Sequence, residues 1–157
     1  MKIVSNLIKH YDEDRYWRSR EYVVQKGGNK LLKILRLLYL RRCDALNGAS
    51  MGTHLGGGAT FAEPPHLPHG LKGIVISHFA KFGRGVRIFH QVTIGNDDRD
   101  IENAPEIGDN VTIFPGAKIV GKIKIGNNVT IGPNAVVFFD VPDNATVIVE
   151  RPKVIIK

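Results

Sequence analysis

The sequence predicts an all-β repeat fold, a parallel β-helix of hexapeptides, preceded by an N-terminal α-helical segment. The first observation is that an apolar residue recurs every six residues between Ile74 and Thr146. The second is that Gly and Asn gather at positions four to six of these units, where they favour turns. The third is that position one is also apolar, as expected for a short strand that points alternate side chains inward. A fixed short period of this kind is typical of a stacked repeat.

The third position of the unit carries the strongest signal. It is occupied by Ile76, Phe82, Ile88, Ile94, Ile107, Ile113, Ile119, Ile125, Ile131 and Val137. The same phase extends backwards to residues 53–70, where Leu55, Phe61 and Leu67 take this position. Two interruptions, residues 71–73 and 98–104, divide the repeat. We therefore expect fourteen hexads, in blocks of three, four and seven. Because proline cannot donate to a strand ladder, we expect the second and third hexads to be irregular.

We expect three segments: residues 1–50 as the helical segment, 51–146 as the β-helix, and 147–157 as an extended tail. In the first segment, residues 1–26 favour one or two short helices, and 30–43 favour a basic helix with a wide apolar stripe. We expect this basic helix to cap the open end of the β-helix or to pack at a subunit contact, because the first coil would otherwise expose its strand edges. The alternative is a peripheral membrane helix. Its cations would then lie near anionic lipid; they are Lys30, Lys33, Arg36, Arg41 and Arg42.

The charge of the chain lies mostly in its N-terminal third. Residues 1–50 hold eleven Lys or Arg and five Asp or Glu, whereas residues 51–157 hold eleven and ten. No nucleic-acid motif accompanies the basic segment, so we expect no nucleic-acid partner. Cys43 is the only cysteine, which excludes an internal disulfide. No apolar run is long enough to span a membrane, and the first residues lack the apolar core of a signal peptide. We therefore expect a cytoplasmic protein.

Several longer motifs resemble a known family. They are LPHG at 67–70, GIVIS at 73–77, FHQVTIG at 89–95, APEIGDNVTI at 104–113, GAKIVGKIKIGNNVTIGPNAVV at 116–137 and DVPDNATV at 140–147. These stretches are similar to the left-handed β-helix acyltransferases, and most closely to their serine O-acetyltransferase-like branch. The resemblance implies a left-handed β-helix with three hexads per coil, a homotrimer, and acetyl-CoA bound between subunits as the acyl donor, with no metal.

The hexad count brings two histidines together. With three hexads per coil, His69 and His90 both occupy position five of the same face, so they should stack about 4.8 Å apart, the spacing of adjacent strands. The resemblance assigns His69 as the catalytic residue, and an imidazole can take the proton of an acceptor hydroxyl. We expect His90 to orient the acceptor or to share the proton. We expect structural roles for His54, His66 and His78.

The candidate cofactor residues also come from the resemblance. Pro115 and Pro133 stand where the family has small residues along the pantetheine channel, and Gly116 beside them is a further candidate. The outward pair Phe138 and Phe139 replaces a polar pair that approaches acetyl-CoA. Arg151 or Lys153 in the tail could meet the phosphates of the cofactor.

Two departures from the family pattern concern the acceptor. Serine acetyltransferases carry Asp directly before the catalytic His and an Arg-His pair after the long loop. Here these places hold Pro68 and the pair Asn103 and Ala104. We therefore expect a hydroxyl of a sugar or surface-polysaccharide precursor as the acceptor, with serine as the alternative. An acid of the 98–104 loop would have to orient His69; the candidates are Asp98, Asp100 and Glu102.

Two other classes of function stay open. A zinc hydratase of the carbonic anhydrase type shares this β-helix, but it needs three histidines around one metal, and no third is well placed beside His69 and His90. A non-catalytic β-helix scaffold is the other alternative.

Overall fold

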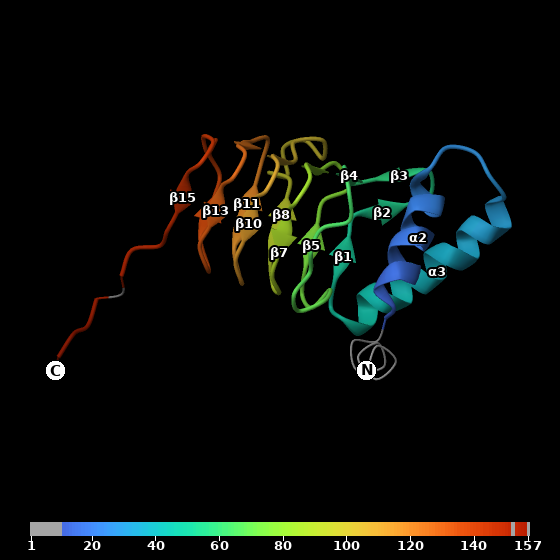
Figure 1. Cartoon of the computed structure of the whole chain (residues 1–157), viewed down its shortest axis with the longest axis horizontal. Helices are drawn as coiled ribbons and strands as arrows, with labels where there is room; N and C mark the ends of the chain where they lie inside the picture. Colours follow the sequence, from blue (N-terminus) through green and yellow to red (C-terminus); the bar gives the residue numbers. More distant parts are fainter. Residues whose placement is uncertain (1–10, 152, 157) are drawn as a thin grey trace.

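The computed structural model describes residues 11–151 and 153–156, which form two helices followed by a β-helix (Figure 1). The helices are α2 (Glu13–Val24) and α3 (Lys30–Leu46). The strands of the β-helix are β1 (Ser50–Met51), β4 (Thr60–Phe61), β5 (Val75–Ile76), β6 (Lys81–Phe82), β7 (Arg87–Ile88), β8 (Thr93–Gly95), β9 (Glu106–Ile107), β10 (Thr112–Ile113), β11 (Lys118–Val120), β12 (Lys124–Ile125), β13 (Thr130–Ile131), β14 (Val136–Val137) and β15 (Thr146–Val147).

The strands form three parallel sheets, one for each face of the β-helix. Their orders are β1-β5-β8-β11-β14, β12-β9-β6-β4 and β15-β13-β10-β7. Successive hexads therefore lie on the three faces in turn, and each hexad pairs with the hexad three units further along the chain. This is the three-hexad coil that the family resemblance implies, and it is consistent with a left-handed β-helix.

The interior of the β-helix is filled by position three of the hexads. Each residue at position three pairs with the residue at position three of the next coil, as Ile76 does with Ile94 and Ile94 with Ile119. These side chains are almost fully buried, with at most 3% of their surface exposed. Burial of an aliphatic side chain contributes about 1.5–3 kcal/mol, so the six-residue period supplies most of the driving force for stacking. The predicted core is confirmed at this position.

Asparagine makes one corner of the β-helix. Asn110, Asn128 and Asn144 adopt left-handed backbone conformations, with φ of 56°, 56° and 59°. Asn tolerates this region better than most residues. The side-chain amide of Asn110 donates to Asn128 over 3.3 Å, and that of Asn128 donates to Asn144 over 3.0 Å. The turn residues therefore form a ladder of their own parallel to the sheets.

The prediction for the first hexad, residues 53–58, is wrong. These residues form an antiparallel hairpin, β2 (Thr53–His54) with β3 (Gly57–Gly58), and Leu55 is 43% exposed. The glycines at 56 and 58 adopt positive φ, which lets the chain reverse in two residues. The first strand of the β-helix is instead β1, where buried Met51 pairs with Ile76. Leu55 was assigned to the repeat because it lies six residues before Phe61, which is the spacing of the hexads.

The last predicted hexad, 141–146, is out of phase by two residues. Val141 forms a bridge with Ile125, and Thr146 and Val147 pair with Thr130 and Ile131. The strict period would have put Asp143 inward, and its carboxylate would then have been buried without a partner. A shortened corner after β14 avoids this cost, so Val147 belongs to the last coil and the tail begins after it.

Prolines make the third hexad irregular, as predicted, whereas the second hexad, also predicted to be irregular, forms the paired strand β4. The strand of the third hexad is reduced to a single parallel bridge between His66 and Arg87. The next residue of this hexad, Leu67, is nevertheless 2% exposed and lies in the core. The chain therefore keeps the inward side chain while it loses most of the ladder at this edge.

Helix α2 caps the open end of the β-helix through a buried arginine. The guanidinium of Arg20 donates to the carbonyl oxygens of Met51 (3.5 Å) and Ala59 (2.5 Å) and to Oγ1 of Thr53 (3.1 Å). The first coil has no coil below it, so Arg20 supplies donors that a neighbouring strand would otherwise provide; the Met51 oxygen also accepts from the Thr53 hydroxyl over 3.5 Å. Burial lowers the pKa of Arg20 to about 10. The cap that the sequence assigned to the helix of residues 30–43 is thus made mainly by α2, and α3 adds one hydrogen bond, from Arg41 to the carbonyl oxygen of Thr53 over 2.9 Å.

Helix α3, predicted over residues 30–43, extends to Leu46 and packs against α2. The buried Tyr16 hydroxyl donates to Oδ1 of Asp44 over 2.6 Å and ties the two helices together. Burial raises the pKa of Asp44, and the hydrogen bond from Tyr16 opposes this rise. None of the described helices combines the length and apolar character that a bilayer-crossing segment needs.

Candidate active site

His69 and His90 meet at one corner of the β-helix, between the β7 face and the β5 face. Their ring centroids lie 4.7 Å apart, and their Nδ1 atoms lie 2.6 Å apart. This is the juxtaposition that the hexad count predicts, because both residues hold position five and one coil separates them. Figure 1 shows the stacked coils that carry them.

The backbone around the pair is fixed by turns and by the ladder between coils. Gly70, directly after His69, has φ of 67° and donates to the carbonyl oxygen of Leu67 over 3.0 Å. Gln91, directly after His90, has φ of 58° and donates to the carbonyl oxygen of Lys72 over 2.9 Å. Both histidines therefore stand at turns whose direction is set by left-handed residues and by hydrogen bonds to the neighbouring coil.

An aromatic stack supports the imidazole of His69. The ring of Phe89 meets this imidazole edge-on with centroids 5.5 Å apart, and Phe89 itself stacks on Phe114 of the next coil at 5.1 Å. The sequence does not single out Phe89 and Phe114 as site residues, although both hold position four of the same face. That shared position is the signal from which the contact could have been inferred.

The short distance between the Nδ1 atoms requires one of them to donate and the other to accept. One nitrogen must carry a proton and the other must accept it, because two acceptors or two donors would repel each other. If Nδ1 of His69 donates, its Nε2 keeps a lone pair and can act as a base. His90 is then the group that orients His69, a role that the sequence left to an acidic residue of the 98–104 loop.

Two acids at this corner, Asp97 just before the loop and Asp100 within it, bond to groups of residues 99–103. Asp97 accepts from the backbone N–H of Arg99 and from the amide of Asn103, and these bonds lower the pKa of Asp97. Asp100 accepts from the backbone N–H of Glu102 over 2.9 Å. Within one subunit this loop lies at a different corner from His69, the one that follows β8.

Three of the candidate cofactor residues continue the histidine corner. The N–H of Gly116 donates to the carbonyl oxygen of His90 (3.2 Å), and that of Asn134 donates to the carbonyl oxygen of Pro115 (2.9 Å). Position five of successive coils is thus His69, His90, Pro115 and Pro133. This column forms one continuous edge.

The other candidates lie elsewhere in the chain. Phe138 and Phe139 follow β14, at the corner of the 98–104 loop, and are 71% and 50% exposed. Arg151 and Lys153 lie in the exposed tail. The chain therefore brings together His69, His90, Pro115, Gly116 and Pro133, but not the other four candidates.

His54 and His78 form a second pair at the corner of the loop, with ring centroids 5.1 Å apart. Burial and the nearby His78 lower the pKa of His54. Among the residues described by the structure, no group of three or more His, Cys, Asp or Glu is placed to hold a metal ion.

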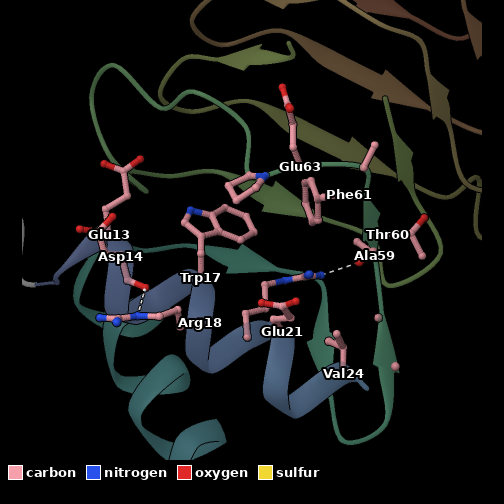
Figure 2. A pocket seen from close by; sticks show the side chains of 15 residues that line it. Glu13, Asp14, Trp17, Arg18, Glu21, Val24, Ala59, Thr60, Phe61 and Glu63 are labelled. Carbon is pink, nitrogen blue, oxygen red and sulfur yellow. Dashed lines mark hydrogen bonds between the residues drawn. The ribbon is translucent and has the colours of Figure 1, made fainter. Parts of the chain in front are cut away.

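The histidine pair lies on an exposed corner, and a cavity of about 800 Å³ lies elsewhere, between α2 and the chain from Gly57 to Pro64 (Figure 2). Figure 2 shows Trp17 and Phe61 side by side in its lining, with Glu13, Asp14 and Glu63 around its rim. The ring centroids of Trp17 and Phe61 are 5.3 Å apart. This cavity adjoins the capped end of the β-helix and contains none of the candidate site residues.

Comparisons with known proteins agree with this architecture. Residues 104–138 match the family described as "Bacterial transferase hexapeptide (six repeats)". The chain is 37% identical over 121 residues to a serine acetyltransferase of Staphylococcus epidermidis, covering 76% of this chain and 56% of that protein. It is 35% identical over 121 residues to one of Staphylococcus aureus, with the same coverage. The chain thus spans about half the length of the curated relatives it matches.

Solved structures give the same picture. The structure of serine acetyltransferase from Neisseria gonorrhoeae superposes with a TM-score of 0.65 and 32% identity, covering 77% of this chain and 45% of that one. Isoform 3 of serine acetyltransferase from Entamoeba histolytica, in complex with cysteine, superposes with a TM-score of 0.67 over 99% of this chain and 64% of that one. At 22% identity the second match shows the fold alone. The repeats, the three-faced coil and these similarities place the chain among the hexapeptide-repeat acyltransferases, in the branch that resembles serine O-acetyltransferases.

Proposed function

We propose that the protein is an O-acetyltransferase that moves an acetyl group from acetyl-CoA to the hydroxyl of a small acceptor. The observation that carries the proposal is the hydrogen-bonded pair of His69 and His90 on a hexapeptide β-helix. An exposed imidazole that is oriented through Nδ1 is suited to general base catalysis through Nε2. The similarity to serine acetyltransferases supports the same chemistry.

In the proposed reaction, Nε2 of His69 takes the proton of the acceptor hydroxyl as its oxygen attacks the thioester carbonyl. The imidazolium then returns this proton to the sulfur as the C–S bond breaks, so the products are the acetyl ester and free CoA. His90 accepts a hydrogen bond from Nδ1–H of His69 and stabilises the positive charge that His69 gains. The pair is thus a dyad in which the second imidazole stands where other enzymes use a carboxylate.

Serine is the acceptor that the comparisons favour. The relatives described above are named for serine, so they support this alternative better than the sugar acceptor that the sequence led us to expect. The residues behind the sugar expectation offer no charged group: Ala104 is 6% exposed and apolar, and Pro68 is half-buried. A serine acceptor would therefore have to be recognised through other groups.

We propose that the acceptor and acetyl-CoA meet between two subunits of a homotrimer. The histidine column lies at one corner, whereas Phe138, Phe139 and the 98–104 loop lie at another. A threefold assembly can bring these two corners of neighbouring subunits together. Sedimentation equilibrium at micromolar concentration should give three times the mass of the chain, and a monomer would contradict the intersubunit site.

The acceptor can be identified by measuring CoA release with a thiol reagent. Purified protein and acetyl-CoA should be incubated with L-serine, with D-serine, and with a panel of nucleotide sugars and oligosaccharides. L-serine should give the highest kcat/KM and produce O-acetylserine by mass spectrometry. A sugar that is turned over more efficiently than L-serine would reverse the choice of acceptor. No acceptor-dependent release with any compound would favour the scaffold alternative.

A further inference from the structure

The helical segment presents a surface that has no partner among the described residues of the chain. Helix α3 lies at the end of the β-helix farther from the C-terminal tail (Figure 1). We propose that the outward face of α3, together with an arginine-lined groove beside it, docks on an anionic lipid surface.

The outward face of α3 is aliphatic. Leu31, Leu35 and Leu38 are 67%, 56% and 62% exposed, and Ile34 is 37% exposed. Residues three and four apart lie on one side of a helix, so these four side chains form one stripe, the α3 stripe. The opposite side of the helix buries Lys33, Leu40, Cys43 and Asp44. Packing among the described residues thus leaves the α3 stripe uncovered, and contiguous exposed apolar surface of this kind marks interaction sites.

A groove of about 560 Å³ runs beside the stripe, between α2 and α3. Its lining residues are Arg15, Arg18, Ser19, Leu32, Leu35, Arg36 and Tyr39. Leu35 belongs to both the groove and the stripe, so the two features are continuous. The arginines come from two helices and converge on the groove, so its described lining holds three guanidinium groups and no carboxylate.

Aromatic rings hold two of these arginines. The guanidinium carbon of Arg15 lies 4.5 Å from the ring centroid of Tyr39, and that of Arg36 lies 4.3 Å from that of Tyr22. A stacked guanidinium keeps its N–H groups available, and its fork geometry suits phosphate. Within residues 11–151 and 153–156, the ion pair found joins Lys81 and Glu106 on the β-helix. It does not involve the arginines of the groove.

The rest of α3 adds to the positive field. Lys30, Arg41 and Arg42 are exposed, and the sole acidic residue of the helix, Asp44, is buried against Tyr16. A second copy of this surface would bring cations against cations without an acid to pair them. A helical peptide would need an apolar groove, whereas the α3 stripe lies on the convex side of a single helix. A lipid surface fits both features, because phosphate headgroups can enter the arginine groove while the leucines enter the acyl boundary.

Vesicle flotation tests this surface. The intact chain should be mixed with vesicles of phosphatidylcholine and phosphatidylglycerol at a ratio of about 70 to 30, and with vesicles of phosphatidylcholine alone. We expect binding to the mixed vesicles, weaker binding at high salt, and at most weak binding to the neutral ones. Each basic residue near an anionic surface contributes roughly fivefold in affinity, so Arg15→Gln/Arg18→Gln/Arg36→Gln should bind about 100-fold more weakly.

Two further variants separate charge from burial. Leu31→Ser/Leu35→Ser/Leu38→Ser keeps every charge and should also lose binding, whereas Lys118→Gln/Lys122→Gln/Lys124→Gln removes the same charge from the β-helix and should bind like the original. Circular dichroism and thermal unfolding show whether each variant is folded. Inorganic phosphate at millimolar concentration should leave vesicle binding intact if lipid is the ligand.

Three results would overturn the proposal. The first is a folded stripe or groove variant that binds the mixed vesicles as well as the original protein does. The second is equal binding to neutral vesicles, or no binding to mixed ones. The third is a molecular mass on sedimentation that is lower for Leu31→Ser/Leu35→Ser/Leu38→Ser than for the original protein. That result would assign the α3 stripe to contact with a second copy of the chain.

Discussion

The Nδ1 atoms of His69 and His90 lie 2.6 Å apart, each at the same corner of consecutive coils. When Nδ1 of His69 carries the shared proton, its Nε2 keeps a lone pair and can act as the base. The contact is the same from either side, so the order of the proposed dyad comes from the family resemblance: His69 acts on the acceptor, and His90 acts through His69.

Removing His90 should therefore weaken catalysis without abolishing it. His90→Ala should lower kcat by about tenfold to 100-fold, less than the loss of a general base, and should leave the KM for acetyl-CoA nearly unchanged. His90→Asn, whose amide oxygen can still accept from Nδ1–H, should recover part of the loss. In a double-mutant cycle the effects of His69→Ala and His90→Ala should not add, because both act on one proton. Full additivity in steady-state kinetics would mean that the two residues act separately.

Phe139 is predicted to contact acetyl-CoA. Phe138 and Phe139 are exposed and pack edge-on with centroids 5.6 Å apart, which makes an apolar patch on a polar surface. Phe139→Ala should raise the KM for acetyl-CoA severalfold and leave the KM for the acceptor unchanged. Leu55→Ala, at the other end of the β-helix, is the matched control. An unchanged cofactor KM in the Phe139 variant would remove this residue from the cofactor site.

Arg20 should be essential for the capped end of the β-helix. Arg20→Met keeps a long side chain but removes the guanidinium donors from the carbonyl oxygens of Met51 and Ala59 and from the Thr53 hydroxyl, which should cost about 2–5 kcal/mol of unfolding free energy. Arg18→Met, two residues away on an exposed side of α2, should change stability by less than about 0.5 kcal/mol. Urea denaturation measures both. Equal stability of the two variants would show that the guanidinium hydrogen bonds do not hold the cap.

The Tyr16 hydroxyl should stabilise the protein in a pH-dependent way. The pKa of Asp44 is raised in the folded state, mainly by burial, so its carboxylate opposes folding above that pKa and the opposition disappears as the pH falls below its unfolded value. The hydrogen bond from Tyr16 relieves part of this cost.

Tyr16→Phe should therefore lose about 1.5–3 kcal/mol at pH 7, and the loss should shrink as the pH is lowered toward 4. Tyr22→Phe is the control, because the Tyr22 hydroxyl accepts one exposed hydrogen bond, from the backbone N–H of Asn29. A loss that is independent of pH would mean that the carboxylate is not involved.

The repeat period made the body of the fold predictable. A residue at position three has no alternative to the interior, so the burial of Ile88, Ile113 and Ile131 follows from the period alone, and the pairing of His69 with His90 follows from counting hexads. The period fails where the chain leaves the stack. The hairpin of residues 53–58 and the shortened corner before Val141 depend on glycine conformations and on the cost of burying Asp143, which a hexad count does not include.

Contacts between distant segments could not be predicted. Arg20 caps Met51 and Ala59, and Tyr16 binds Asp44, through pairings that no local pattern encodes. The orienting role of His90 also needed the distance between two side chains, so the sequence assigned it to acids of the 98–104 loop. The cofactor residues remain a prediction, because within the chain they lie at two corners and in the tail and do not form one site.

The most direct test of the proposed function is single-turnover acetyl transfer by His69→Ala. With enzyme in excess over acetyl-CoA and with saturating L-serine, the variant should transfer the acetyl group about 10²–10⁴ times more slowly than the original protein. It should still bind acetyl-CoA with unchanged affinity by calorimetry. An undiminished rate in the folded His69→Ala protein would contradict the assignment of His69 as the base.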